Sequence, residues 1–268
     1  MTPPVHLLHL TDPHLPPPGE TVHGTDTAPR FEAMLADIAA RHGPGGTQPP
    51  LEFAVLTGDL TRDGEPAAYQ RLRGMLAGLP CPSHLVLGNH DDRAAFRAAF
   101  PEAPVDAEGF VQQAVRGPAG LSLMLDTLDQ GAPGGRLCER RLAWLAARLA
   151  EDPETPALIF LHHPPMPVGI AGMDAIGLAD PDAFWAVLAP HRARIRQIFH
   201  GHLHRPIGGS WRGIPVFSLR GSAFDVALDL GAPPRRLAVE ARLGASYGVI
   251  RVTEDTVVAH TRSLPAQG

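Results

Sequence analysis

The sequence predicts an α/β fold in which strands and helices alternate along the chain. Short apolar runs recur between segments whose apolar residues have helical spacing, a pattern typical of βαβ units. Several runs stop at polar residues such as Thr57-Gly58-Asp59, at the end of the strand where ligands of α/β sheets bind. No internal repeat or low-complexity linker is present, so residues 1–268 are expected to form a single domain.

The expected elements follow one another in a regular order. The first strand covers residues 5–10, and Asp12 and His14 lie on the loop after it because Pro13 cannot continue a strand interior. The other expected strands cover 53–56, 84–87, 121–125, 157–161 and 195–199, and the expected helices cover 28–41, 67–79 and 139–149. Short alternating strands follow from Ile214, and residues 246–262 are expected to form an antiparallel hairpin.

Composition excludes several classes of protein. The 268 residues carry a formal net charge of -5, so the clustered cations that bind long nucleic acids are not expected, whereas a small anionic substrate is compatible. No apolar stretch is long enough to span a membrane, and no leader typical of secretion is recognised. Two cysteines give no zinc-finger spacing. We therefore expect a cytoplasmic protein without a membrane partner.

Seven residues with metal-binding side chains follow five of the expected strands, namely Asp12, His14, Asp59, Asn89, His162, His202 and His204. We expect all of them at the same edge of one sheet. Oxygen ligands mixed with imidazoles favour manganese, iron, zinc or cobalt over calcium or magnesium. Seven ligands are too many for one tetrahedral zinc, so the sequence predicts two divalent or mixed-valence metal ions.

The motifs around Asp12, Asp59 and Asn89, each taken alone, favour an ordinary turn, because Gly, Asp and Asn favour turns. The pair His202 and His204 points instead to a cation, because two buried imidazoles without partners would be costly. Taken together in one order, the motifs indicate a metal site. The remaining histidines that lie outside this set receive no functional role: His6, His9, His42, His84, His191 and His260.

The ordered motifs resemble the calcineurin-like metallophosphoesterase superfamily. They are Asp12-x-His14, Gly58-Asp59, Gly88-Asn89-His90-Asp91, His162-His163-Pro164 and Gly201-His202-x-His204. Within that superfamily, Met173-Asp174-Ala175-Ile176-Gly177-Leu178 and His204-Arg205-Pro206 make the chain similar to bacterial class III cyclic nucleotide phosphodiesterases and glycerophosphodiesterases. His200 departs from the pattern, which has a small or apolar residue before the glycine.

The resemblance implies a four-layer α/β/β/α sandwich and a set of ligand roles. Asp12, His14 and His204 would hold the first metal, Asn89, His162 and His202 would hold the second, and Asp59 would bridge both. His90 is the expected proton donor to the leaving group, the alternative being a residue that orients Asn89. Asp91 is expected to orient His90. Three further assignments stay open: His163 orients a ligand or lines the pocket, and His23 and Arg205 contact substrate or face solvent.

The expected reaction is hydrolysis of small phosphodiesters, either cyclic nucleotides or glycerophosphodiesters, by a hydroxide that the metals activate. A phosphomonoesterase and a nucleotide-sugar pyrophosphatase are alternatives on the same scaffold. A non-catalytic metal-binding scaffold protein is less compatible, because all seven ligand positions are retained. Association into a homo-oligomer is implied only by analogy with similar proteins.

Overall fold

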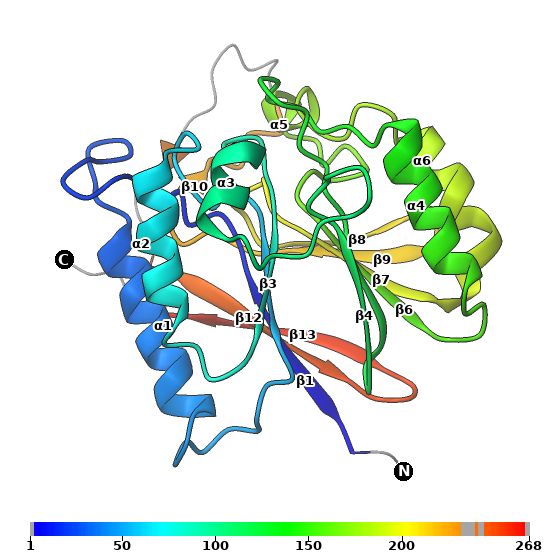
Figure 1. The fold of residues 1–268 in the computed structure, drawn as a ribbon, viewed down its shortest axis with the longest axis horizontal. Helices are drawn as coiled ribbons and strands as arrows, with labels where there is room; N and C mark the ends of the chain where they lie inside the picture. The colour runs from blue at the N-terminus through cyan, green and yellow to red at the C-terminus, as the bar shows by residue number, and fades with distance from the viewer. Residues whose placement is uncertain (1–2, 232–238, 241–243, 266–268) are drawn as a thin grey trace.

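A computed structural model of the chain describes residues 3–231, 239–240 and 244–265. Its two main sheets lie face to face, with helices α1 and α2 outside one sheet and α4 and α6 outside the other (Figure 1). The predicted four-layer α/β/β/α arrangement is therefore confirmed.

The first sheet has the strand order β13-β12-β1-β2-β3. Its strands are β1 (Val5–Leu10), β2 (Ala54–Thr57), β3 (Ser83–Val86), β12 (Ser246–Val252) and β13 (Val257–Ser263). The helices beside it are α1 (Ala28–His42), α2 (Pro66–Leu76) and α3 (Arg93–Ala99). Strands β1, β2 and β3 are parallel, whereas β12 pairs antiparallel with β1 and with β13. The predicted C-terminal hairpin is thus confirmed.

The second sheet has the strand order β4-β5-β6-β7-β9-β8. Its strands are β4 (Gln113–Gly117), β5 (Gly120–Met124), β6 (Ala157–Leu161), β7 (Ile195–His200), β8 (Ile207–Trp211) and β9 (Ile214–Ser218). The helices are α4 (Glu139–Ala150), α5 (Ala171–Asp174), α6 (Pro181–Leu188) and the 3-10 helix η1 (Ala189–Arg194). A separate pair of short strands, β10 (Asp225–Val226) and β11 (Val239–Glu240), lies beyond β9 in the chain.

Alternation along the strands assigns each side chain to a layer. In β1, Leu7 packs between the two sheets, whereas Leu8 and Leu10 pack in the cluster that includes residues of α1. In β6, Phe160 reaches the inter-sheet layer and stacks on Phe199 of β7, with ring centroids 5.1 Å apart. Each such buried side chain contributes about 1.5–3 kcal/mol to folding. This layer holds the two sheets in a fixed relative position.

One expectation about the sheet was wrong, because the seven predicted ligands do not come from a single sheet. The loops after β1, β2 and β3 leave the first sheet, and those after β6 and β7 leave the second. Helices α3 and α6 and strand β4 were also not predicted. Strand β4 is an edge strand without a fully buried residue, so its sequence lacks the apolar run of a central strand.

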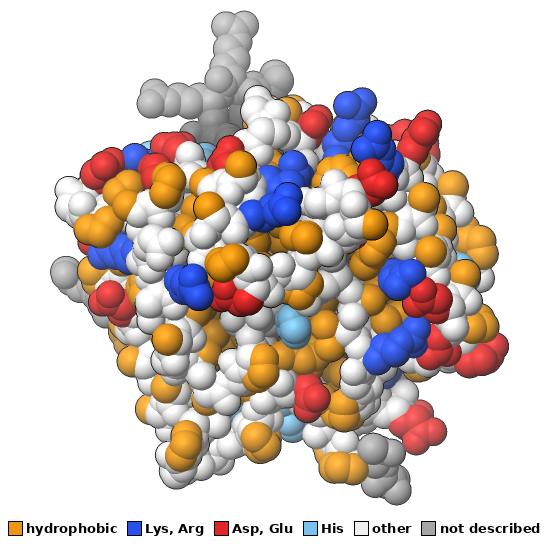
Figure 2. All heavy atoms as spheres, viewed as in Figure 1, with side chains coloured by type: hydrophobic (Ala, Val, Ile, Leu, Met, Phe, Trp, Pro, Cys, Tyr) orange, Lys and Arg blue, Asp and Glu red, His pale blue; other side chains and the backbone are white. Residues whose placement is uncertain are grey.

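The surface agrees with the composition. On the face shown in Figure 2, acidic and basic side chains are interspersed and do not form one continuous basic surface. Among the described residues, no helix is both long and apolar enough to cross a membrane.

Candidate metal centre

Four of the predicted ligands form one buried group at the carboxyl ends of the strands. Asp12, His14, Asp59 and His204 offer ligand atoms that all lie within 4.8 Å of one another. His14 Nε2 is 3.3 Å from Asp59 Oδ2 and 3.1 Å from His204 Nε2. His204 Nε2 lies 3.7 Å from Asp12 Oδ1. The first predicted ligand set and the predicted bridging residue are therefore brought together.

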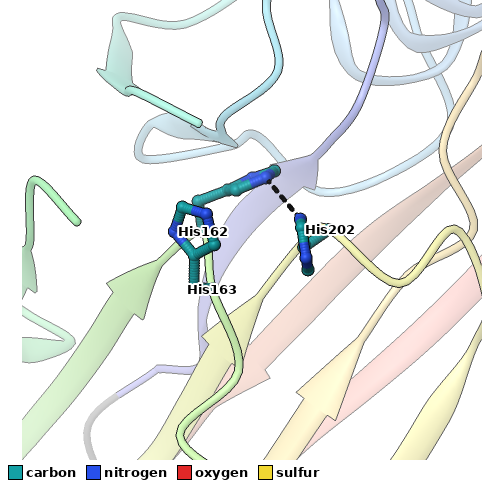
Figure 3. A group of neighbouring side chains, drawn as sticks. All are labelled: His162, His163 and His202. Atoms are coloured by element: carbon teal, nitrogen blue, oxygen red, sulfur yellow. Dashed lines mark hydrogen bonds between the residues drawn. The ribbon is translucent and has the colours of Figure 1, made fainter. Parts of the chain in front are cut away.

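A second group also borders Asp59, at the same carboxylate oxygen as the first. His162 Nε2 is 3.4 Å from Asp59 Oδ2, 3.2 Å from Asn89 Oδ1 and 3.1 Å from His202 Nδ1. The rings of His162, His163 and His202 converge from the ends of β6 and β7 (Figure 3). The Asp59 carboxylate thus touches both groups, as a bridging ligand must.

The backbone at these positions adopts a conformation that side-chain-bearing residues rarely take. Non-glycine residues seldom have positive φ, and such strain is commonly found at functional sites. Seven non-glycine residues of the described ranges have positive φ, and five of them are predicted ligands: Asp12, His14, Asp59, His202 and His204. The loops are therefore shaped to direct these side chains inward at a cost in local conformational energy.

Gly58 is required beside this cluster. Its φ is 96°, and a Cβ atom at this position would collide with the imidazole of His162. Gly201 is equally restricted, because a Cβ there would meet the Thr11 hydroxyl and the Asp12 carboxylate. Larger residues at either position would push the ligand side chains apart.

The ring nitrogens fit the coordination of metal ions. His162 Nδ1 lies 2.7 Å from the Thr57 carbonyl and His204 Nδ1 lies 3.0 Å from the Phe224 carbonyl, so each ring donates Nδ1–H and keeps Nε2 as a lone-pair donor. Among the described residues, the buried Nε2 atoms of His202 and His163 have no hydrogen-bond partner. A buried imidazole nitrogen without a partner is costly, and a cation would satisfy it.

The charges of the cluster are consistent with the same interpretation. Burial favours the neutral imidazole and lowers the pKa of His14 and His202 well below the usual value, and neutral imidazole is the metal-binding form. Burial also opposes ionisation of Asp59, but nearby His162 outweighs it and holds the pKa of Asp59 well below its usual range. Against the effect of burial, the Asp59 carboxylate in turn raises the pKa of His162 to about 9. The bridging position is thus occupied by a carboxylate, the form that binds cations.

His90 borders the cluster and stays accessible. Its Nδ1 lies 2.6 Å from the Arg62 carbonyl, which leaves Nε2 as the ring atom able to face a substrate. The ring packs edge-on against His14, 4.7 Å between centroids, and 41% of the side chain is exposed. Its backbone N–H donates to Asp59 Oδ1 at 2.9 Å, so the loop carrying Asn89 and His90 is fixed to the bridging carboxylate.

The hydrogen bonds of Asp91 differ from the expected pairing with the His90 ring. The buried carboxylate accepts from the backbone N–H groups of Leu60, Thr61 and Gly88 and from the Tyr69 hydroxyl. Burial raises the pKa of Asp91 to about 6. Asp91 therefore fastens the loop after β2 to the loop after β3, which fixes Asp59 relative to Asn89.

The three residues with open assignments lie in different places. His163 is buried in the second group, with Nδ1 2.8 Å from the Thr127 hydroxyl. Arg205 donates to the Val226 carbonyl at 2.7 Å. His23 is exposed and stands edge-on to Phe224 at 4.9 Å between centroids.

Comparison with known proteins identifies the family. The family model for calcineurin-like phosphoesterases matches residues 5–206, which contain both groups of the candidate metal centre. The chain belongs to the calcineurin-like phosphoesterase family.

Within this family, the chain is similar to proteins named as cyclic nucleotide phosphodiesterases. It is 43% identical to a probable cyclic nucleotide phosphodiesterase of Rhodopseudomonas palustris over 97% of this chain and 92% of the relative. It is 32% identical to the 3′,5′-cyclic adenosine monophosphate phosphodiesterase of Escherichia coli K12, over 78% of this chain and 73% of that protein. A cAMP/cGMP dual specificity phosphodiesterase of Mycobacterium tuberculosis is also 32% identical, over 94% of this chain and 77% of the relative.

A solved structure with a similar fold supports the architecture. A dimetal phosphatase from Danio rerio superposes with a TM-score of 0.68 at 16% identity, covering 97% of this chain and 96% of that one. At this identity the likeness shows the fold alone.

The family motifs do not include one segment that contacts the site. Phe224 stacks on His204 with ring centroids 4.1 Å apart and an interplanar angle of 11°, and its carbonyl accepts from the same ring. Gly221 lies so close to Asp12 and His204 that a Cβ atom would come within 2.8 Å of Asp12 Cβ. A backbone carbonyl has no sequence signature, and a single phenylalanine resembles any core residue, so no sequence pattern indicates this contact.

Proposed function

We propose that this phosphoesterase uses two metal ions to hydrolyse the phosphodiester of 3′,5′-cyclic nucleotides. The observation that carries the proposal is the pair of buried ligand groups joined at the Asp59 carboxylate. The names of the similar proteins support cyclic nucleotides over glycerophosphodiesters, the other class of diester expected from the sequence.

The assignment of ligands follows the two groups. Asp12, His14 and His204 would hold the first ion, Asn89, His162 and His202 would hold the second, and Asp59 would contact both. This assignment is supported by the distances within each group and by the central position of Asp59. The mixture of oxygen and imidazole ligands favours manganese, iron, zinc or cobalt for both ions.

Two bound cations would neutralise the phosphoryl oxygens and lower the pKa of water. Hydrolysis adds water to phosphorus and breaks the bond to the ester oxygen, which leaves as an alkoxide that needs a proton. His90 Nε2 supplies that proton, since the Arg62 carbonyl holds Nδ1 and keeps the ring in place. Asp59 holds the His90 backbone N–H, so the proton donor and the bridging ligand keep a fixed separation.

A substrate panel tests the proposal. Protein supplied with Mn²⁺ is incubated with 3′,5′-cyclic AMP, 2′,3′-cyclic AMP, glycerophosphocholine, a nucleotide-sugar, bis-p-nitrophenyl phosphate and p-nitrophenyl phosphate. We expect the highest kcat/KM with a cyclic nucleotide and a clear preference for diesters over monoesters. A preference for p-nitrophenyl phosphate would contradict the proposal and favour a phosphomonoesterase. Cleavage restricted to nucleotide-sugars would favour a pyrophosphatase.

The alternative of a non-catalytic metal-binding scaffold protein makes a different prediction. It requires intact metal binding without turnover of any ester in the panel after addition of Mn²⁺. Single-domain organisation of residues 1–268, a cytoplasmic location and homo-oligomer formation stay predictions. The single-domain prediction covers residues 1–268, and some of these lie outside the described ranges.

A further inference from the structure

A basic pocket lies on the outer face of the first sheet, away from the metal centre. It has a volume of about 340 Å³ and lies where α1 ends and leaves the sheet uncovered. Six of its lining residues are arginine or histidine: Arg41, Arg251, Arg262, His6, His42 and His260. Cavities of about 300–1,000 Å³ are typical of small-molecule sites.

The strand register explains why these side chains share one face. His6 of β1 is paired with Arg251 of β12, and Arg262 of β13 is paired with Tyr247 of β12. Residues two apart on a strand point to the same side, so Tyr247 and Arg251 line the same surface. Leu8, two residues after His6, is covered by the core cluster that includes α1, whereas His6 lies beyond the helix.

The positive charge of the pocket is only partly neutralised. Asp37 accepts from Arg262 at 2.6 Å, Arg41 at 3.1 Å and the Tyr247 hydroxyl at 2.8 Å. No Asp or Glu occurs among the described residues that line the pocket, and Arg251 has no ion pair within the described part of the chain. Burial and then the neighbouring Arg251 lower the pKa of His6, as expected in a positive local field. The pocket contrasts with the chain's net charge of -5.

The walls between the charged groups are apolar. Val249 and Pro49 line the pocket, and the ring of the fully buried Tyr247 forms its floor. The Pro49 carbonyl lies 2.7 Å from His42 Nδ1, which holds the loop 43–50 against the helix end. The chain contains no lysine, so its permanently charged basic side chains are all arginines. The planar guanidinium of arginine binds phosphate with two parallel hydrogen bonds.

We propose that this basic pocket binds a small organic phosphate, with Arg251 contacting the phosphate and Val249 and Pro49 contacting a flat apolar body. A mononucleotide such as AMP has this chemistry. The site is separate from the metal centre, because His6 lies near the start of β1 whereas Asp12 follows Leu10 at its end, and His6 and Leu10 are about 13 Å apart along the strand.

Calorimetric titration of the full chain with AMP tests the proposal, with adenosine and inorganic phosphate as comparison ligands. Replacing Arg251 with Gln removes the unpaired charge and should weaken the binding at this pocket about tenfold or more. Arg140→Gln is the matched control, since it removes the same charge from an arginine that is 70% exposed on α4 at the other side of the molecule. Arg251→Lys keeps the charge and should retain part of the affinity.

Thermal unfolding and hydrolysis of bis-p-nitrophenyl phosphate by each variant separate binding from folding and from the proposed function. We expect both to stay unchanged in Arg251→Gln, and we expect a crystal soaked with AMP to show its phosphate at Arg251. The proposal is overturned if Arg251→Gln binds AMP as wild type does, or if adenosine or inorganic phosphate binds as tightly as AMP. An inactive wild-type protein that binds AMP through Arg251 would contradict the proposed function and support the pocket.

Discussion

The two sheets contribute different chemistry to the same centre. The loops of the first sheet supply both carboxylates, the amide and one imidazole, through Asp12, Asp59, Asn89 and His14. The loops of the second sheet supply only imidazoles. The negative charge that attracts two cations therefore comes from one half of the molecule, and the other half completes the coordination with neutral donors.

The two halves are also held together through these residues. The His202 backbone N–H of the second sheet donates to Asp12 Oδ1 at 3.1 Å, and His162 Nδ1 lies 2.7 Å from the Thr57 carbonyl of the first. The positions of the ligand side chains thus depend on how the two sheets are placed relative to each other, as well as on the conformation of their own loops. Loss of the Asp59 carboxylate from the first sheet should therefore weaken the binding of both ions, whereas loss of an imidazole from the second sheet should affect mainly one ion.

The largest effect is expected for Asp59→Asn, which removes the carboxylate touching both groups. Hydrolysis should fall by at least about 10³-fold and bound metal should decrease at both positions. Asp182→Asn is the control, because Asp182 on α6 is 81% exposed and lies outside the cluster. Measurement of metal per chain alongside kcat checks the result, and a folded Asp59→Asn protein with full metal content would contradict the bridging role.

His202→Ala tests the contribution of the second sheet. One neutral donor is lost while the carboxylates stay, so activity should fall about 10²-fold or more and about one ion per chain should remain. Elemental analysis of this variant beside Asp59→Asn compares the two sheets directly. Loss of both ions in His202→Ala would contradict the prediction that a donor from the second sheet affects mainly one ion.

His90→Asn removes the proposed proton donor without removing a ligand. The rate with 3′,5′-cyclic AMP should fall about 10²-fold, because its alkoxide leaving group needs a proton. The rate with bis-p-nitrophenyl phosphate should change far less, since p-nitrophenolate is a good leaving group. Equal losses with both substrates, or reduced metal content, would instead assign His90 to orienting Asn89.

A smaller effect is expected from Phe224→Ala, which removes the ring stacked on His204 but keeps the carbonyl that accepts from it. Affinity for the first metal should weaken about tenfold, as for other groups that orient a ligand. Phe224→Leu should restore part of the packing. Titration with Mn²⁺ followed by paramagnetic resonance gives the affinity, and unchanged affinity in both variants would exclude the positioning role.

The smallest effect on activity is expected from Asp37→Asn, because this residue supports only the outside of the first sheet. The Arg262 guanidinium holds the pKa of Asp37 below its usual value, so the interaction stabilises the fold at pH values above about 4. It is lost as the pH falls further, when the unfolded chain takes up the proton first. Chemical denaturation should show a loss of about 1 kcal/mol at pH 7 that shrinks below pH 4. A constant difference across this range would contradict the assignment.

The elements that deliver the ligands could be predicted from the sequence because buried parallel strands are continuous apolar runs. The expected strands at 5–10 and 157–161 coincide with β1 and β6, and the motif residues follow them directly. The division into two sheets could not be derived from those runs, since the same pattern suits one sheet or two. It was implied only by the resemblance to the family.

The contacts around the ligands were less predictable. Asp91 was expected to orient His90, but its hydrogen bonds go mainly to backbone N–H groups of two loops. Phe224 was not considered at all, because it acts through its carbonyl and its ring face. Such contacts depend on how distant loops pack, which local residue patterns do not specify.

The central claim is that both groups bind cations around one shared carboxylate. A crystal of the protein grown with Mn²⁺, with diffraction recorded at the manganese edge, tests it most directly. We predict two anomalous peaks about 3.5–4 Å apart, both next to Asp59, with the second contacted by Asn89, His162 and His202. A single peak, or two peaks of which only one contacts Asp59, would contradict the claim.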